Sequence, residues 1–386
     1  MLIVSLIIFS IIISYFVPKR RIGLYMGLIT IILSCLYLGF VPPRDFDLYR
    51  HFELFNTIKK MSFKELFFSD YKGNSAQMAD YIDSAKGYLF YLFAISRLKI
   101  KELLPVVTGI ITYGLLFNRI KNIARDFVMP NYCMALGISI VLIFIDFRDI
   151  SCIRNILAYV IFAFAIYQDL VKKKRQVFCF IIYILLCTFH MACLILLAIR
   201  LLLLLSNKYL KGLATILLIG IFPMGEVIMN FVGKFSGSAY LSRLAYKIHV
   251  YRFGRTEYNW HGAIMFFLIL AVFFVGFLYV QKNIREIRIK NYSTFCIYVI
   301  AFTLGASSQY DILLRNIELI VILLLPHMML FVQKFVDFKN GHLLIKCNSL
   351  GGNVYFIVFM ICSLATLVFY SWIAYIPMNQ YFMIKG

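Results

Sequence analysis

The sequence predicts an all-α polytopic membrane protein, and three observations lead to this fold class. The chain of 386 residues is 62% hydrophobic and only 15% charged, with a mean hydropathy of +0.85, so it has too little polar surface for a soluble globule of this size. Apolar runs long enough to cross a bilayer recur along the whole chain. Basic clusters separate these runs, as in cytoplasmic loops of membrane proteins. We therefore expect a single integral membrane domain over residues 1–386.

The charge and the cysteines fit this class. A formal net charge of +21 would favour nucleic acid in a soluble protein, but here the basic residues lie between apolar runs, so we predict contact with membrane lipids and no nucleic acid. Residues 1–17 lack the basic start and cleavage site of a signal peptide and are expected to remain as the first helix. The nine cysteines lack C-x-x-C spacing, and we predict neither metal nor cofactor.

The basic clusters predict the path of the chain through the membrane. Residues 172–175 and 208–211 should both face the cytoplasm, so the stretch between them crosses twice, with its turn near His190. The cluster of Arg119, Lys121 and Arg125 is expected to form another cytoplasmic loop. About twelve helices then satisfy every cluster, with both termini outside. The predicted spans are 2–17, 22–41, 102–118, 131–147, 155–171, 177–189, 191–205, 212–232, 262–280, 293–310, 316–332 and 353–372.

Two outer loops are longer than a connection requires, which is typical of functional segments. The first covers residues 42–86 and is followed by an interfacial or re-entrant helix to about residue 98. The second covers 233–261 and is rich in basic and aromatic residues. A guanidinium can bind two phosphate oxygens at once, and aromatic rings stack on sugars. Arg243, Arg252 and Arg255 are therefore candidate ligands of an anionic sugar carrier. The alternative is a solvated loop on anionic lipid headgroups.

Candidate catalytic residues follow the second predicted span. Asp45 and Asp47 come directly after Pro42-Pro43, at the lip of the membrane. A carboxylate there could take the proton of a sugar hydroxyl, with Arg44 binding substrate, or it could pair with Arg44 or Arg50 and shape the loop.

The predicted hairpin tips hold further candidates. An arginine at membrane depth is costly, so Arg148 and Arg154 are candidate clamps on a diphosphate leaving group; the alternatives are snorkelling and pairing with Asp149. His190 is either a catalytic or orienting group or a structural turn residue. Arg315 is a candidate substrate ligand, or it pairs with Asp311, four residues earlier on the same helical face.

Several short motifs resemble the EpsG family, which is related to the Wzy-type polymerases of O-antigen and capsule polysaccharides. They are Asp45-Phe-Asp47-Leu-Tyr49, Arg154-Asn-Ile-Leu-Ala158, Phe189-His190 and Tyr310-Asp311 with Arg315. The resemblance covers the chain in topology. It implies a membrane glycosyltransferase of the bacterial cytoplasmic (inner) membrane, with its active site facing the periplasm or exterior.

The same resemblance implies the substrates and partners. The enzyme would join undecaprenyl-diphosphate-linked oligosaccharide units, as both donor and acceptor, without metal. A flippase and a chain-length regulator of the same pathway would be its partners. Arginines would hold the diphosphates, and Asp45, Asp47 or His190 would take the hydroxyl proton.

Three other functions remain as alternatives. An O-antigen ligase, or another polyprenyl-linked membrane glycosyltransferase, would use the same features. A flippase would be expected to carry charges in mid-span, whereas here the polar residues gather at the predicted outer tips. A membrane O-acyltransferase would need a histidine-centred site deep in a span, and the sequence offers no persuasive one.

Overall fold

The computed structural model describes residues 2–44, 46–68, 85–145, 147–205, 207–220, 260–283, 287–307, 309–339 and 342–345, with residues 357, 358 and 361. This part of the chain is helical, as predicted, apart from one β-hairpin formed by β1 (Val336–Lys339) and β2 (His342–Ile345). Most of the predicted loop 233–261 and of the predicted span 353–372 lies outside the described residues.

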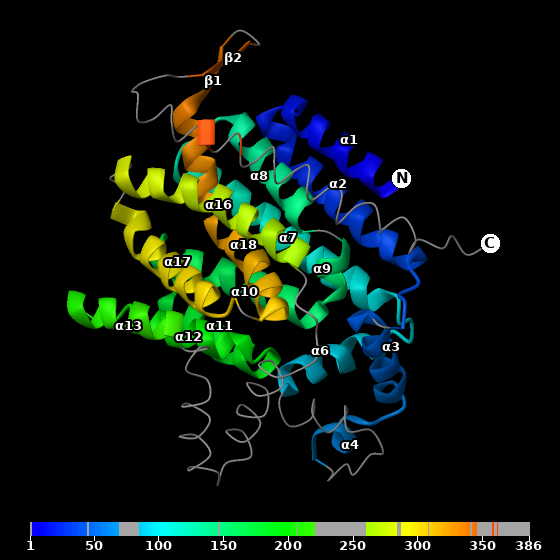
Figure 1. The fold of residues 1–386 in the computed structure, drawn as a ribbon. Coiled ribbons are helices and arrows are strands. Elements are labelled where there is room, and N and C mark those ends of the chain that lie inside the picture. The colour runs from blue at the N-terminus through cyan, green and yellow to red at the C-terminus, as the bar shows by residue number, and fades with distance from the viewer. Residues whose placement is uncertain are drawn as a thin grey trace.

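The helices follow one another as Figure 1 shows. The N-terminal part holds α1 (Leu2–Phe16), η1 (Lys19–Arg21), α2 (Ile22–Cys35), η2 (Leu36–Gly39), α3 (Asp47–Ile58), α4 (Phe63–Phe68) and α6 (Lys86–Ser96). Then come α7 (Leu103–Asp126), α8 (Asn131–Phe144), α9 (Phe147–Ser151), α10 (Ile153–Leu170), α11 (Gln176–Phe189), α12 (Ala192–Leu202) and α13 (Lys208–Gly220). The last helices are α16 (Trp260–Asn283), α17 (Ile287–Gly305) and α18 (Tyr310–Phe335).

Several of these helices are those of a multi-pass membrane protein. Within the described residues, five stretches are long and apolar enough to cross a bilayer: Lys19–Gly39, Leu103–Asp126, Ile153–Leu170, Gly262–Lys282 and Ile312–Phe335. Shorter apolar helices of 10–17 residues lie beside them, including α8, α11 and α12. The total of about twelve spans stays a prediction.

The core lies along α10 and α18. α10 packs against α7, α11, α17 and α18, while α16 runs along α18 (Figure 1). Every residue from Asn155 to Val160 is buried, and so is every residue from Ile317 to Phe331. A helix that is apolar on all sides belongs inside a bundle, so these two helices hold the others in place.

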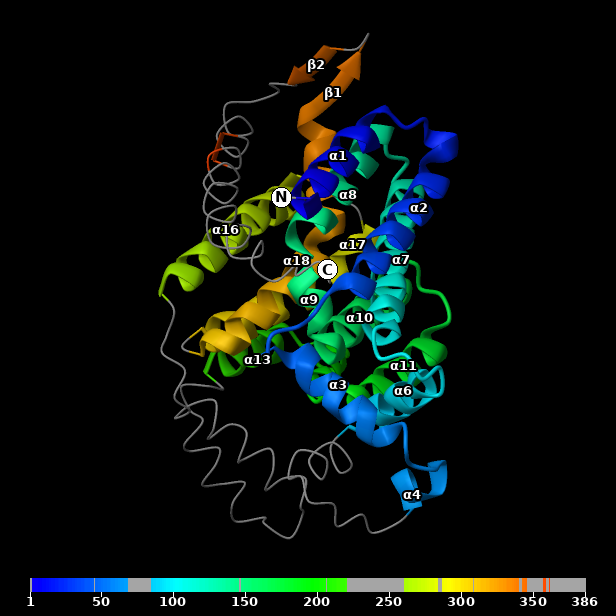
Figure 2. The same ribbon diagram turned by 90° about the vertical axis from the view of Figure 1, so that its right-hand side faces the viewer.

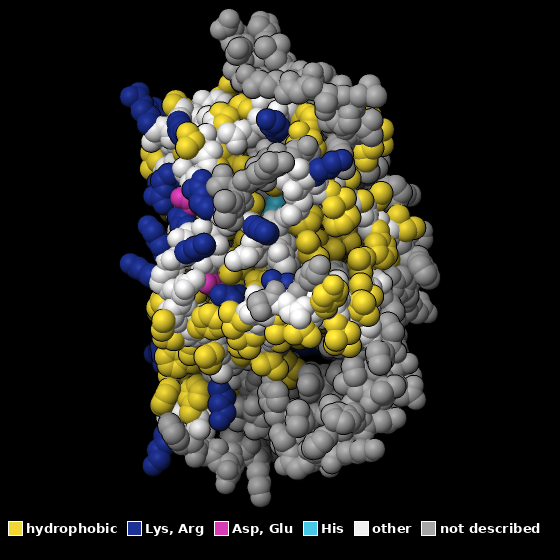
Figure 3. Space-filling model, turned by 90° about the vertical axis from the view of Figure 1, so that its left-hand side faces the viewer, with side chains coloured by type: hydrophobic (Ala, Val, Ile, Leu, Met, Phe, Trp, Pro, Cys, Tyr) yellow, Lys and Arg dark blue, Asp and Glu magenta, His cyan; other side chains and the backbone are white. Residues whose placement is uncertain are grey.

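One end of the bundle gathers the basic clusters. The ammonium of Lys19 donates to the carbonyl of Met129 at 3.3 Å, Lys172 pairs with Asp126 at 3.3 Å, and Arg288 donates to the Asp126 carbonyl at 3.3 Å. Lys and Arg side chains are scattered among hydrophobic ones over the described part of the face that Figure 3 presents. The charge pattern therefore predicted correctly that these basic segments lie on the same side of the bundle. We call this end, defined by residues 19–21, 121–129, 172–175 and 288–290, the basic end.

The prediction of a cytoplasmic loop at Arg119 is wrong. α7 continues to Asp126, and Arg119 is only 1% exposed. Its guanidinium donates to the Tyr292 hydroxyl and to the Leu323 carbonyl, and its central carbon lies 5.6 Å from the ring centroid of Tyr167. Those carbonyl and aromatic partners lie on other helices, so a linear sequence gives no sign that this cation turns inward. A charge inside a span, which the sequence was expected to lack, is therefore present.

Short helices fill the described part of the predicted outer loop 42–86. α3 and α4 lie within it, and the buried residues Leu48, Phe52, Phe55 and Ile58 give α3 an apolar face. α6 lies where the sequence predicts an interfacial or re-entrant helix. Its 11 residues make it about 16 Å long, too short to span a bilayer. The predicted turn near His190 is confirmed, because α11 ends at Phe189 and α12 begins at Ala192.

Candidate functional site

Three helices bring polar side chains together at the end of α10 opposite the basic end. Asp47 and His51 come from the first two turns of α3, Tyr88 from α6 and Arg154 from the first turn of α10. Figure 2 looks onto this end and shows α3, α6, α9 and α10 there. We call these four residues the tip cluster.

Direct contacts hold the tip cluster together. The Tyr88 hydroxyl and His51 Nδ1 are hydrogen-bonded at 2.8 Å, and the two rings lie 5.2 Å apart. The guanidinium carbon of Arg154 lies 5.8 Å from the centroid of the Tyr88 ring, within the range of a cation–π interaction. Tyr88 therefore links the arginine of the predicted diphosphate clamp to a buried histidine.

His51 is held in its neutral form. Its side chain is buried, at 3% exposure. Burial and the nearby charge of Arg154 lower the pKa of His51 to about 3; Asp47 acts in the opposite direction and Arg50 in the same one. A neutral imidazole has one donor and one acceptor nitrogen, so His51 can relay a hydrogen bond near neutral pH without carrying charge.

Asp47 begins α3 at the rim of this site. A carboxylate in the first turn is favoured by the helix dipole, and Asp47 also pairs with Arg50 at 3.6 Å. The side chain of Asp47 is 36% exposed, so a substrate from outside can reach it. Pairing with Arg50 was one of the two predicted roles. Arg44 lies exposed nearby along the chain, and Asp45 lies outside the described residues.

Cys152 connects the tip cluster to a second group of charges. Burial raises the pKa of this thiol, and the charges of Glu318, Asp47, Arg315 and Asp149 all act on it. Helix α18 thus brings Glu318 beside Asp149 of α9, although more than 160 residues separate them in sequence. Arg315, a predicted substrate ligand, is half-buried there.

A cavity of about 190 Å³ opens beside Cys152, between α9, α16 and α18. We call it the tip pocket. The carboxylates of Asp149 and Glu318 line it, with Tyr310 and Phe266 among its aromatic walls. The rings of Tyr310 and Phe266 lie 5.8 Å apart. Carboxylates accept hydrogen bonds from hydroxyls and aromatic rings cover apolar sugar faces, so the pocket offers the chemistry that a sugar unit needs.

His190 lies in the turn between α11 and α12, next to the tip cluster. Its Nδ1 accepts the backbone N–H of Ala192 at 3.2 Å, and its ring meets that of Tyr159 edge-on at 5.9 Å. The preceding Phe189 contacts Tyr88 at 5.5 Å. The hydrogen bond from Ala192 gives His190 the structural turn role that was one of its two predicted roles. The imidazole ring nevertheless lies beside the tip cluster.

A glycine permits the close approach of α6 and α11. A Cβ on Gly87 would lie 2.6 Å from the Thr188 hydroxyl and 3.3 Å from the Phe189 backbone nitrogen. Any side chain at residue 87 would therefore push the Tyr88 helix away from the α11–α12 turn.

The side chains of the remaining predicted site residues are not described. The backbone of Arg148 lies in α9, and that of Asp311 lies in α18. Arg243, Arg252 and Arg255 are not described at all. Among the described residues, no three His, Cys, Asp or Glu side chains gather closely enough to hold a metal ion.

Sequence reasoning missed His51, Tyr88 and Glu318. His51 follows Asp47 by four residues, so reading residues 47–58 as a helix would have placed both on one face. Glu318 lies in a predicted apolar span, and an ionisable residue there is itself a signal of function. No comparable signal marks Tyr88 among the many aromatic residues.

Comparisons with models of protein families, with curated proteins and with solved structures found no match for this chain.

Proposed function

We propose that this protein is a membrane glycosyltransferase that polymerises oligosaccharide units carried on undecaprenyl diphosphate. The tip cluster and the tip pocket would form its active site. The chain would cross a bacterial cytoplasmic membrane about twelve times, with this site facing the periplasm or exterior. The observation that carries the proposal is Arg154, a half-buried cation at the end of a core helix, beside Tyr88 and the neutral His51.

The reaction assigns a task to each side of the site. The acceptor hydroxyl oxygen attacks the anomeric carbon of the donor sugar, and the bond from that carbon to the diphosphate oxygen breaks. The bonding electrons stay with the diphosphate, whose growing negative charge Arg154 stabilises. The hydroxyl proton passes to a carboxylate, for which Asp47 is the candidate in reach of solvent.

The tip pocket would hold the acceptor sugar next to the reacting anomeric carbon. Asp149 and Glu318 would accept hydrogen bonds from sugar hydroxyls, and Tyr310 would cover a sugar face. Arg315, close enough to act on Cys152, supplies positive charge for a second diphosphate. Two lipid diphosphates meeting at one site is the requirement that separates polymerisation from simple transport.

Arg154→Ala tests the proposal. In a strain lacking the native gene, the variant should reduce polymer by about 100-fold or more at normal protein level, because it removes fixed positive charge from the leaving group. Arg154→Lys should restore activity in part, since it keeps the charge but loses the planar fork. Arg97→Ala is the matched control: this arginine of the same end donates to the carbonyls of Ile58 and Met61 and does not contact the tip cluster.

Gel profiles of the surface polysaccharide identify the step that is lost. Core carrying a single repeat unit in the Arg154→Ala strain is expected for a polymerase. Bare core would assign the protein to ligation or flipping instead. Full-length polymer in that strain would remove Arg154 from the site.

A further inference from the structure

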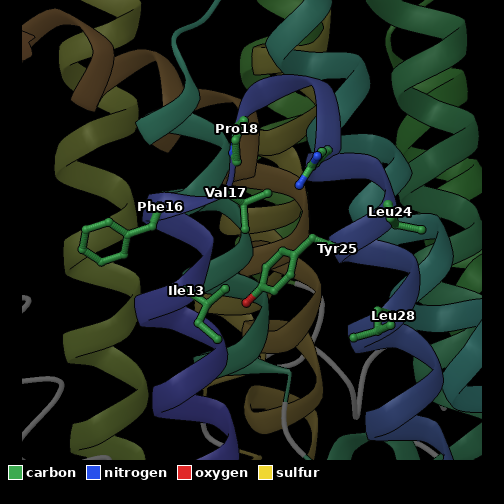
Figure 4. A pocket seen from close by; sticks show the side chains of 8 residues that line it. Ile13, Phe16, Val17, Pro18, Leu24, Tyr25 and Leu28 are labelled. Carbon is green, nitrogen blue, oxygen red and sulfur yellow. The ribbon is translucent and has the colours of Figure 1, made fainter.

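A groove with a cavity of about 430 Å³ separates α1 and α2 near their connecting turn. Figure 4 shows Ile13 from α1, Val17 just after the end of α1, and Tyr25 from α2 around it. The Tyr25 hydroxyl donates to the carbonyl of Ser10, which ties the two helices together beside the groove. The volume falls in the range of about 300–1,000 Å³ that is typical of small-molecule sites.

The groove is open to the outside and its walls are apolar. Leu24 and Leu28 complete the wall formed by α2, and these side chains are 76% and 55% exposed. Phe16, at the end of α1, is 81% exposed. Side chains this apolar and this exposed need a hydrocarbon surface beside them, which a lipid acyl chain supplies.

One cationic side chain lines the groove at the turn between α1 and α2. Arg21 is the single charged side chain of the lining. It belongs to η1, where Lys19 is already engaged with the carbonyl of Met129. Within the described residues no carboxylate pairs with Arg21. A guanidinium at the mouth of an apolar groove matches a molecule with one anionic end and one hydrocarbon end.

The position of the turn matches the level of lipid headgroups. η1 belongs to the basic end, where the ends of several spans meet, and this is where phosphates of a bilayer lie. Basic pockets between transmembrane helices are known places for anionic phospholipids.

We propose that the groove between α1 and α2 binds a phospholipid, with its anionic headgroup on Arg21 and one acyl chain between the two helices. The site lies at the end of the bundle away from the tip cluster and serves no step of the proposed polymerisation. The bound lipid fills the groove between α1 and α2 and so stabilises the packing of α1 against α8.

Native mass spectrometry of the purified full-length protein tests this site. Phosphatidylglycerol and phosphatidylcholine with identical acyl chains are added to the protein in mild detergent, and bound lipid is counted. The wild type should bind phosphatidylglycerol more tightly. Arg21→Gln should weaken that binding by about fivefold, the effect expected for one basic residue near a lipid headgroup.

Arg20→Gln is the matched control, because it removes the same charge from the same turn at a residue that does not line the groove. It should leave binding within about twofold of the wild type, since an exposed charge away from the site acts only weakly. Leu28→Trp should weaken the binding of both lipids by filling the groove. Glycerol phosphate, which carries the headgroup charge without a chain, should not displace the lipid.

Four results would overturn the proposal. Equal losses in Arg20→Gln and Arg21→Gln would assign the effect to general surface charge. Equal binding of the two lipids in the wild type would remove the role of the headgroup. Displacement by glycerol phosphate would leave an anion site without a lipid. A lipid-free dimer that dissociates in Leu28→Trp would make a second copy the occupant.

Discussion

Burial of neutral His51 should make the free energy of unfolding fall as the pH falls, and a substitution of His51 should remove this contribution. In the folded protein the pKa of His51 is lowered to about 3 by burial and by the charge of Arg154. In the unfolded chain it should lie near the ordinary value of about 6.5. Between these values the unfolded state binds a proton that the folded state does not, so the free energy of unfolding falls as the pH falls.

The size of the effect follows from these two values. Each pH unit below about 6.5 lowers the free energy of unfolding by ~1.4 kcal/mol, so a change from pH 7 to pH 5 costs about 2 kcal/mol. His51→Gln keeps a hydrogen-bonding group next to Tyr88 but cannot titrate. The loss of stability between the two pH values should therefore be about 2 kcal/mol smaller in the variant than in the wild type.

Unfolding in mixed detergent micelles, followed by circular dichroism at both pH values, measures this difference. The comparison between wild type and variant cancels the contributions of all other groups that titrate in both proteins. His190→Gln serves as the control, because it removes a half-buried histidine and leaves His51 in place. If His51→Gln and wild type lose equal stability on acidification, His51 is not held neutral and the reasoning fails.

Two further predictions concern the opposite end and the orientation. Arg200 donates two hydrogen bonds to Asp169 at 2.7 and 3.3 Å, and both side chains are buried. Asp169→Asn should lower the free energy of unfolding by about 3–5 kcal/mol because it leaves a buried cation uncompensated, and adding Arg200→Met should recover most of that loss; equal stability of the single and double variants would contradict this. In a background without native cysteines, an impermeant maleimide added from outside should label Arg44→Cys and leave Lys174→Cys unlabelled, because the basic residues around 174 are expected in the cytoplasm. Labelling of Lys174→Cys alone would reverse the orientation and move the tip cluster to the cytoplasmic face.

Charge and hydropathy predicted much of the path of the chain. The basic residues at 19–21, 172–175 and 288–290 lie at one common end of the bundle, as the charge pattern predicts, and the same parity located the turn between α11 and α12 within two residues of His190. These features are predictable because a membrane imposes its length and charge rules on each segment separately. Neighbouring helices are not needed to apply them.

The side chains that face inward were a different matter. Arg119 looked like part of a cytoplasmic cluster, but in the structure it lies among Tyr167, Tyr292 and the carbonyl of Leu323. Its favourable contacts come from residues 48 to 204 positions away. No local pattern records such partners, because they depend on which helices become neighbours.

The candidate site divides in the same way. The sequence by itself determined that Arg154, His190 and Arg315 lie at the turns of apolar hairpins, since span length and loop charge fix where each hairpin turns. Only the tertiary structure decided that α3 packs His51 against Tyr88, and that α18 brings Glu318 to the pocket beside Cys152. The physical reason is that turns follow from how each segment meets the bilayer, whereas contacts between distant segments follow from the packing of whole helix surfaces.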